Sequence, residues 1–212
     1  QAIQPRGATL VVVGDTTLAD IVPVLNKHFG DWKGVGAAAA STDIPEVAGM
    51  TSPRVFLIDQ PGAVQANIFA AELVPSSKDA GATVFDMANM VIGGDFTSRL
   101  NMNLREDKHW SYGARSGAGG AVGQRIWRVS APVQIDKTGE SIAEIKRELD
   151  AFTSGKQGAT AEELQRMQKI LTLSLPGAYE TASSVMSTIA SNVRYGRPDD
   201  YDIAAETSDD VN

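Results

Sequence analysis

The feature that most constrains the fold is a change of hydrophobic period along the chain. Apolar and polar residues alternate over 64–70 and again over 125–134, as they do in half-buried strands. From residue 138 onward, apolar residues instead recur at helical spacing. Strands in one block with helices after them predict an α+β fold, in which helices pack on a mainly antiparallel sheet.

Further strands and helices are expected from composition and end signals. Strands are predicted at Ala8–Gly14, Arg54–Asp59 and 111–118. Helices are predicted over about 79–92 and 96–106, in a segment after Asp15 or Thr16, and in three segments beyond Thr138. Pro23 is expected to delay or kink the first helix, and Pro132 to mark a bulge or a sheet edge.

Capping signals fix two of the later helix starts. Thr138 is expected to cap a helix, and Thr160 and Glu163 have the spacing of a capping box.

The chain divides at a stretch of low complexity. Residues 33–53 are mostly Gly, Ala, Ser, Thr and Pro without a sustained period, which indicates a linker. We therefore expect a strand and helix over 1–32 that end a preceding domain. An α+β domain over 54–212, truncated at its C-terminus, is expected to follow the linker.

Composition argues against several classes of protein. A formal charge of −7 disfavours nucleic-acid binding, which needs clustered Lys and Arg. No apolar run reaches the roughly 18 residues of a membrane span. Cysteine is absent, and the two histidines, His28 and His109, lie 81 positions apart. Since a zinc site usually takes three or four His, Cys or carboxylate ligands, no metal site is predicted in this chain.

One segment departs from the acidic character of the chain. The segment from Asp95 to Arg128 contains six basic and three acidic residues, which gives it a local charge of +3. Arg donors and a Tyr hydroxyl suit the carbonyl oxygens of an extended peptide. A solvated basic face with internal ion pairs would give the same composition, so the residues alone leave both readings open.

The same segment carries a family resemblance. Ser98–Asn101, Leu104–Glu106 and Ser111–Gly113 resemble a signature of pitrilysin/insulinase-type zinc metallopeptidases, in the form of mitochondrial processing peptidase and its bacterial relatives. Three other segments also resemble the family: Leu10–Asp15, Phe29–Trp32 and Asp59–Gln65. Taken together, the resemblance runs from about residue 5 to residue 195. His109 and Trp110 depart from the pattern, since relatives often have Gly and a variable apolar residue there.

The resemblance implies a function and two site residues. In this family one half carries a His-x-x-Glu-His zinc motif, and the other supplies an Arg and a Tyr, seven positions apart, that bind substrate carbonyls. Arg105 and Tyr112 match that spacing, and no His-x-x-Glu-His occurs here. The resemblance thus implies a non-zinc, substrate-binding portion with no catalysis of its own. Its partner would be a zinc-bearing half, upstream or on another subunit, and its ligand a peptide substrate.

Two matters stay open at this point. The rival function is a structural scaffold, like the respiratory-chain core subunits that share the fold without peptidase activity. The compartment is unknown, although the family resemblance suggests the bacterial periplasm. We also predict that Ala8–Gly14 pairs with the sheet of residues 54–134, in cis or by exchange between two chains, because an unpaired sheet edge leaves backbone donors and acceptors for another strand.

Overall fold

The structure is a computed structural model that describes residues 4–34 and 44–196. They divide into two compact units. One unit is residues 46–173, and the other combines the described residues before 46 with those from 174 onward. The domain limits expected from the sequence stay a prediction.

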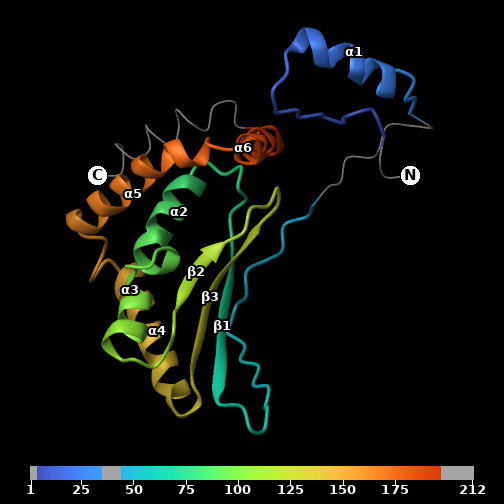
Figure 1. Ribbon diagram of the computed structural model, residues 1–212. Coiled ribbons are helices and arrows are strands. Elements are labelled where there is room, and N and C mark those ends of the chain that lie inside the picture. Colours follow the sequence, from blue (N-terminus) through green and yellow to red (C-terminus); the bar gives the residue numbers. More distant parts are fainter. Residues whose placement is uncertain (1–3, 35–43, 197–212) are drawn as a thin grey trace. The chain divides into compact units, whose positions relative to one another are not determined.

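A three-stranded antiparallel sheet forms the base of the larger unit (Figure 1). Its strands are β1 (Gln65–Val74), β2 (Arg115–Ala118) and β3 (Arg125–Gln134), in the order β1-β3-β2. The β1–β3 ladder runs over ten pairs, from Gln65 opposite Gln134 to Val74 opposite Arg125. The central position of β3 explains why its inward side chains are the most buried of the sheet.

Alternation along the strands places one face of the sheet in the core. Val129, Ala131 and Val133 are fully buried, and alternate β1 residues between Ala66 and Ala70 pack against them. Helices α2 (Ala82–Asn89), α3 (Arg99–Asn101) and α4 (Thr138–Thr153) cover this face (Figure 1). Leu100 of α3, Leu104 in the helical turn after it and Ile145 of α4 are buried in the same cluster. The predicted α+β fold and the inward face of residues 125–134 are confirmed.

Two of the helices of this layer widen into π-helical turns. Helix α2 (Ala82–Asn89) continues as η1 (Met90–Gly94), and α3 (Arg99–Asn101) continues as η2 (Met102–Asp107). Gly93 in η1 lies against β2 so closely that a Cβ there would stand 2.7 Å from the backbone nitrogen of Ser116. The helical segments predicted at 79–92 and 96–106 are therefore present, each with a π-helical second part.

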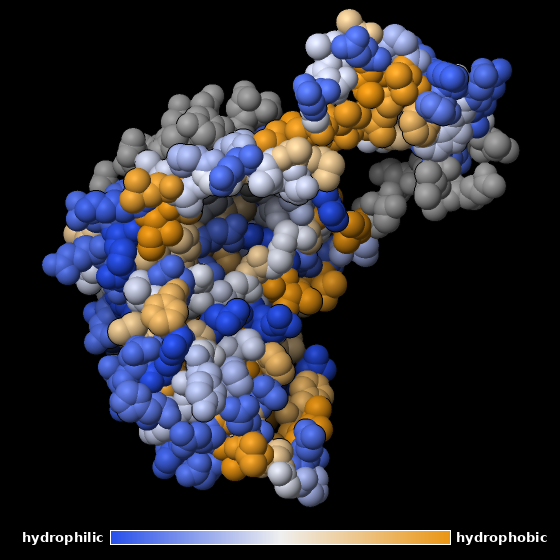
Figure 2. Space-filling model, viewed as in Figure 1, coloured by the Kyte–Doolittle hydropathy of each residue, from blue (hydrophilic) through white to orange (hydrophobic). Residues whose placement is uncertain are grey.

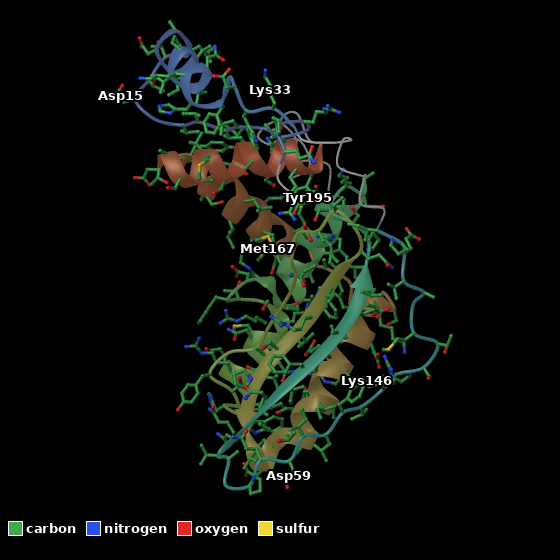
Figure 3. All side chains as sticks on the ribbon, turned by 90° about the vertical axis from the view of Figure 1, so that its right-hand side faces the viewer. Asp15, Lys33, Asp59, Lys146, Met167 and Tyr195 are labelled. Atoms are coloured by element: carbon green, nitrogen blue, oxygen red, sulfur yellow. The ribbon has the colours of Figure 1, made fainter. Side chains whose placement is uncertain are left out.

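The later helices begin at side-chain caps and turns. After the short helix η3 (Ile135–Lys137) come α4 (Thr138–Thr153), α5 (Ala161–Ala178) and α6 (Ala182–Tyr195). The predicted capping box is confirmed, because the Thr160 N–H donates to Glu163 Oε2 at 2.8 Å and the Glu163 N–H donates to Thr160 Oγ1 at 3.2 Å. Met167 of α5, labelled in Figure 3, is 1% exposed.

Two predicted strands are wrong. Neither Ala8–Gly14 nor Arg54–Asp59 (its end is labelled in Figure 3) forms a ladder within the described chain. The pairing of Ala8–Gly14 with the sheet, in cis or by exchange between two chains, stays a prediction. Val55 and Leu57 are each 92% exposed, and the lower right of Figure 2, where this segment and β1 run, shows hydrophobic atoms at the surface. A β-branched apolar run favours an extended chain, but only a partner strand with matching backbone groups makes it a strand.

The expected effect of Pro132 is also wrong. Pro132 lies opposite Asn67 in the central strand rather than at an edge. On the other side of β3, the ladder with β2 stops at Arg115 opposite Ser130, and only the single bridge of Ser111 with Val133 lies beyond it. The absent N–H of proline is tolerated because the neighbouring ladder is interrupted there.

Two helix N-caps predicted from the sequence are wrong by one or two residues. The first helix, α1 (Leu18–Phe29), is capped by Thr17, whose hydroxyl accepts from the Asp20 N–H at 3.3 Å, and it includes Pro23 without ending there. Lys137, not Thr138, is the N-cap of α4, because the Thr138 hydroxyl donates to the Ile135 carbonyl instead.

Candidate functional site

Arg105 lies in the π-helical turn η2, close to its C-terminus. π-Helical turns are rare and frequently occur at functional sites. The guanidinium stands 4.7 Å from the centre of the Phe96 ring, and its Nε lies 3.1 Å from Glu106 Oε1. The ring and the carboxylate restrict the side chain, which nevertheless remains 40% exposed.

The turn that follows η2 is folded back by hydrogen bonds to the helix. The N–H groups of Trp110 and Ser111 both donate to the Leu104 carbonyl, at 2.9 and 3.2 Å. His109 has a φ of 56°, the left-handed conformation that glycine adopts most easily. Glycine would hold this conformation without strain, and the hydrogen bonds from Trp110 and Ser111 close the turn with His109 in place.

The end of β3 holds this turn from the other side. The Gln134 N–H donates to the Trp110 carbonyl at 2.9 Å, and Gln134 Nε2 donates to the His109 carbonyl at 3.0 Å. The Ser111 hydroxyl lies 2.5 Å from the Pro132 carbonyl, next to the bridge of Ser111 with Val133. After η2 the chain therefore turns back and runs beside β3. This turn is what allows Arg105 and Tyr112 to lie near each other.

Arg105 and Tyr112 line the same groove. Its volume is about 560 Å³. The lining residues come from the end of η2, the turn after it and the adjoining ends of β1 and β3: Val64, Gln65, Arg105, Glu106, His109, Trp110, Ser111, Tyr112 and Gln134. Tyr112 is 85% exposed, so its hydroxyl is open to a ligand. The groove thus exposes the N–H donors of the Arg105 guanidinium and the phenol of Tyr112.

Two of the other arginines of the basic segment have structural roles. Arg99 makes a bidentate ion pair with Glu163, at 2.7 and 2.6 Å, and also donates to the carbonyls of Gln157 and Gly158. This hydrogen bonding by Arg99 lowers the pKa of Glu163 from its ordinary 4.5 to about 2. Arg125 is buried and pairs with Asp86 at 2.8 Å. Part of the positive charge of the basic segment is therefore bound in ion pairs that support the fold. Arg105 is the arginine of this segment that lines the groove.

Sequence reasoning missed Gln134 and Phe96. Gln134 is the last residue of the alternating stretch at 125–134, and it holds the turn of the groove by two hydrogen bonds. Phe96 follows the Gly93–Gly94 pair, which indicates a helix end but not a ring placed under Arg105. Neither role has a local sequence signal, because each depends on residues brought together by the fold.

The described residues do not fit a zinc ion. Within 4–34 and 44–196, His, Asp and Glu side chains form no group of three that could hold a metal. Over the same residues, no helix has the length and apolarity to cross a membrane.

Comparison with known proteins identifies the family. Residues 1–171 match the family model described as Peptidase M16 inactive domain. Since the match covers most of the chain, the protein belongs to this family, the inactive domain of the pitrilysin/insulinase-type zinc peptidases. A search of curated protein sequences finds no match.

Solved structures share the fold at low sequence identity. A protease from Helicobacter pylori has a TM-score of 0.84 at 18% identity, over 94% of this chain and 48% of that one. A peptidase M16 inactive domain from Pseudomonas fluorescens has a TM-score of 0.76 at 16% identity, over 94% and 46%. The periplasmic protease PqqL from Escherichia coli has a TM-score of 0.66 at 15% identity, over 94% and 22%. This chain thus spans less than half the length of each of these structures.

Proposed function

We propose that this chain is the non-zinc, substrate-binding portion of a zinc metallopeptidase that hydrolyses peptides. In this proposal Arg105 and Tyr112 donate hydrogen bonds to carbonyl oxygens of an extended peptide. The single observation that carries it is the convergence of these two side chains on one open groove, Arg105 from a helix end and Tyr112 from the bend that follows the turn. The zinc is assigned to a partner half, upstream or on another subunit, because the described residues here do not fit it.

The physical contribution of the pair is preorganisation. Phe96 and Glu106 already restrict Arg105, so little side-chain freedom remains to be lost when a ligand binds. Donors fixed in this way also stabilise negative charge that develops on a carbonyl oxygen during hydrolysis. A lysine would supply the charge but not the planar fork of donors.

Kinetics of the enzyme that includes the zinc-bearing half test the proposal. Tyr112→Phe removes one hydroxyl and is expected to lower kcat/KM by about 10- to 1000-fold, the range for losing one transition-state donor. Zinc content and thermal stability should stay near those of the wild type, since Tyr112 is exposed.

Tyr195→Phe is the matched control, because Tyr195 lies in α6 and lines no part of the groove. It is expected to leave kcat/KM unchanged. Equal activities of wild type and Tyr112→Phe would contradict the substrate-binding role of Tyr112. A protein that has no peptidase activity even with its partner half would favour the scaffold function. The periplasm, named in the description of the Escherichia coli structure, is proposed as the compartment, and cell fractionation would test it.

A further inference from the structure

His109 is the groove residue that the Arg–Tyr pair does not explain. It is exposed, lines the groove and holds a φ of 56°. The left-handed region costs a non-glycine L-residue roughly 1–2 kcal/mol. Its imidazole therefore stands in the groove at a conformational cost that glycine would avoid.

One hydrogen bond fixes both the ring and its tautomer. His109 Nδ1 lies 3.0 Å from the Arg105 carbonyl oxygen. A carbonyl oxygen only accepts, so Nδ1 must carry the proton. In the neutral ring, Nε2 then has no proton and is a hydrogen-bond acceptor.

The groove otherwise has few oriented acceptors. Arg105 is donor-only and the Tyr112 hydroxyl is assigned to a carbonyl. Glu106 pairs with Arg105 through Oε1, so besides His109 the side-chain acceptors of the lining are chiefly Glu106 Oε2 and the amide oxygens of Gln65 and Gln134. An extended peptide presents an N–H as well as a C=O at each residue other than proline. A ligand held by donors alone would leave its N–H groups without protein partners.

Resting on the function proposed above, we propose that His109 is a further binding residue of the groove. Its Nε2 accepts a hydrogen bond from a backbone N–H of the peptide whose carbonyl oxygens bind Arg105 and Tyr112. The substrate class is therefore an extended main chain read through both its carbonyl and its amide groups. The hydrogen bond from Nδ1 to the Arg105 carbonyl holds the imidazole next to Arg105. The Nε2 acceptor therefore keeps its position relative to the residue whose side chain donates.

The experiment measures coupling between the ring and one amide of the ligand. The probe is a short, capped peptide of Ala and Ser, in which a single amide is replaced by an ester at each position in turn. Its binding to the full 212-residue chain is followed by chemical-shift titration. An ester oxygen cannot donate, so at the position that meets Nε2 the wild type should lose affinity by about 3- to 10-fold, the range for one hydrogen bond.

His109→Gly is the variant of choice because glycine adopts a φ of 56° without strain. It should bind the all-amide peptide about 3- to 10-fold more weakly than the wild type and be insensitive to the ester at that same position. His109→Asn, which also tolerates the left-handed region, should behave like the glycine variant. The thermal midpoints of both variants should stay near that of the wild type.

The outcomes separate this inference from the function on which it rests. If Tyr112→Phe weakens binding but wild type and His109→Gly respond alike to the ester at every position, His109 accepts no peptide N–H and the inference is overturned. If the wild type binds no peptide, or Tyr112→Phe has no effect on binding, the proposed function fails and the inference fails with it.

Discussion

At the scale of single residues, two backbone positions decide whether the groove and its support can form. His109 turns the chain through the left-handed region between Arg105 and Tyr112. Gly93 allows η1 to touch β2, the strand that carries the chain onward from Tyr112. The backbone geometry constrains both positions, Gly93 because a Cβ would have no room and His109 because its φ is positive.

Gly93→Ala should destabilise the fold by about 1–3 kcal/mol, the usual cost of overpacking a close contact. The added methyl group would meet the Ser116 backbone nitrogen at 2.7 Å, and a backbone atom cannot rotate away. Gly139→Ala is the control, because no atom lies within 4 Å of the Cβ that it adds at the start of α4. It should be neutral or stabilising by up to about 1 kcal/mol. Urea denaturation decides, and equal midpoints for the two variants would contradict the close-contact argument.

At the scale of elements, Arg99 links α3 to the start of α5. Arg99 pairs with Glu163 in the first turn of α5. It also donates hydrogen bonds to the carbonyls of Gln157 and Gly158, in the loop between α4 and α5. The Phe152 ring lies 5.4 Å from the guanidinium. Since α3 continues into η2, this link also holds the helix that carries Arg105.

The link predicts a defined loss of stability in acid. The pKa of Glu163 is about 2 in the folded chain and ordinarily 4.5, because Arg99 stabilises its charged form. A lowered pKa means that the contribution is complete above pH 4.5 and is lost as the pH falls from there to about 2. Glu163→Gln should therefore be less stable than the wild type by about 1–3 kcal/mol at neutral pH, and this difference should shrink over that window.

Glu162→Gln provides the comparison, since Glu162 is exposed in the same first turn of α5. At neutral pH its free energy of unfolding should lie much closer to that of the wild type than that of Glu163→Gln does. Urea denaturation between neutral pH and pH 2 measures all three proteins. A constant difference between wild type and Glu163→Gln across the window would show that Arg99 does not control this carboxylate.

At the scale of the whole molecule, the described residues form an open groove but no group of side chains that could hold a metal. The described residues hold no His, Asp and Glu group suited to a metal, and the full sequence has two histidines and no cysteine. The solved structures that share the fold are more than twice as long as the part this chain matches. In the function proposed above, a partner half supplies the hydrolytic chemistry.

The purified chain alone is expected to bind no stoichiometric zinc and to cleave no peptide, because a zinc site needs three or four suitable ligands. Metal analysis after dialysis and a peptide-cleavage assay with and without a chelator measure this. Zinc retained at one ion per chain together with chelator-sensitive cleavage would place the catalytic centre here and overturn the assignment to a partner half.

The sequence by itself determined the elements whose signals are local. Alternation marked β1 and β3, and the capping box of Thr160 and Glu163 marked the start of α5. The spacing of Arg105 and Tyr112, read through a family resemblance, selected the two residues that prove to share a groove. These signals are readable because a strand face, a helix cap and a short motif each depend on residues only a few positions apart.

Only the tertiary structure decided which segments found partners. Arg54–Asp59 has the composition of a strand but no ladder, while Pro132 lies in the central strand beside an interrupted ladder. Arg99 and Arg105 look alike in the sequence, yet one is bound by Glu163 and the other lines the groove. In each case the outcome depends on a backbone group or side chain far away in the sequence, and local propensity carries no information about it.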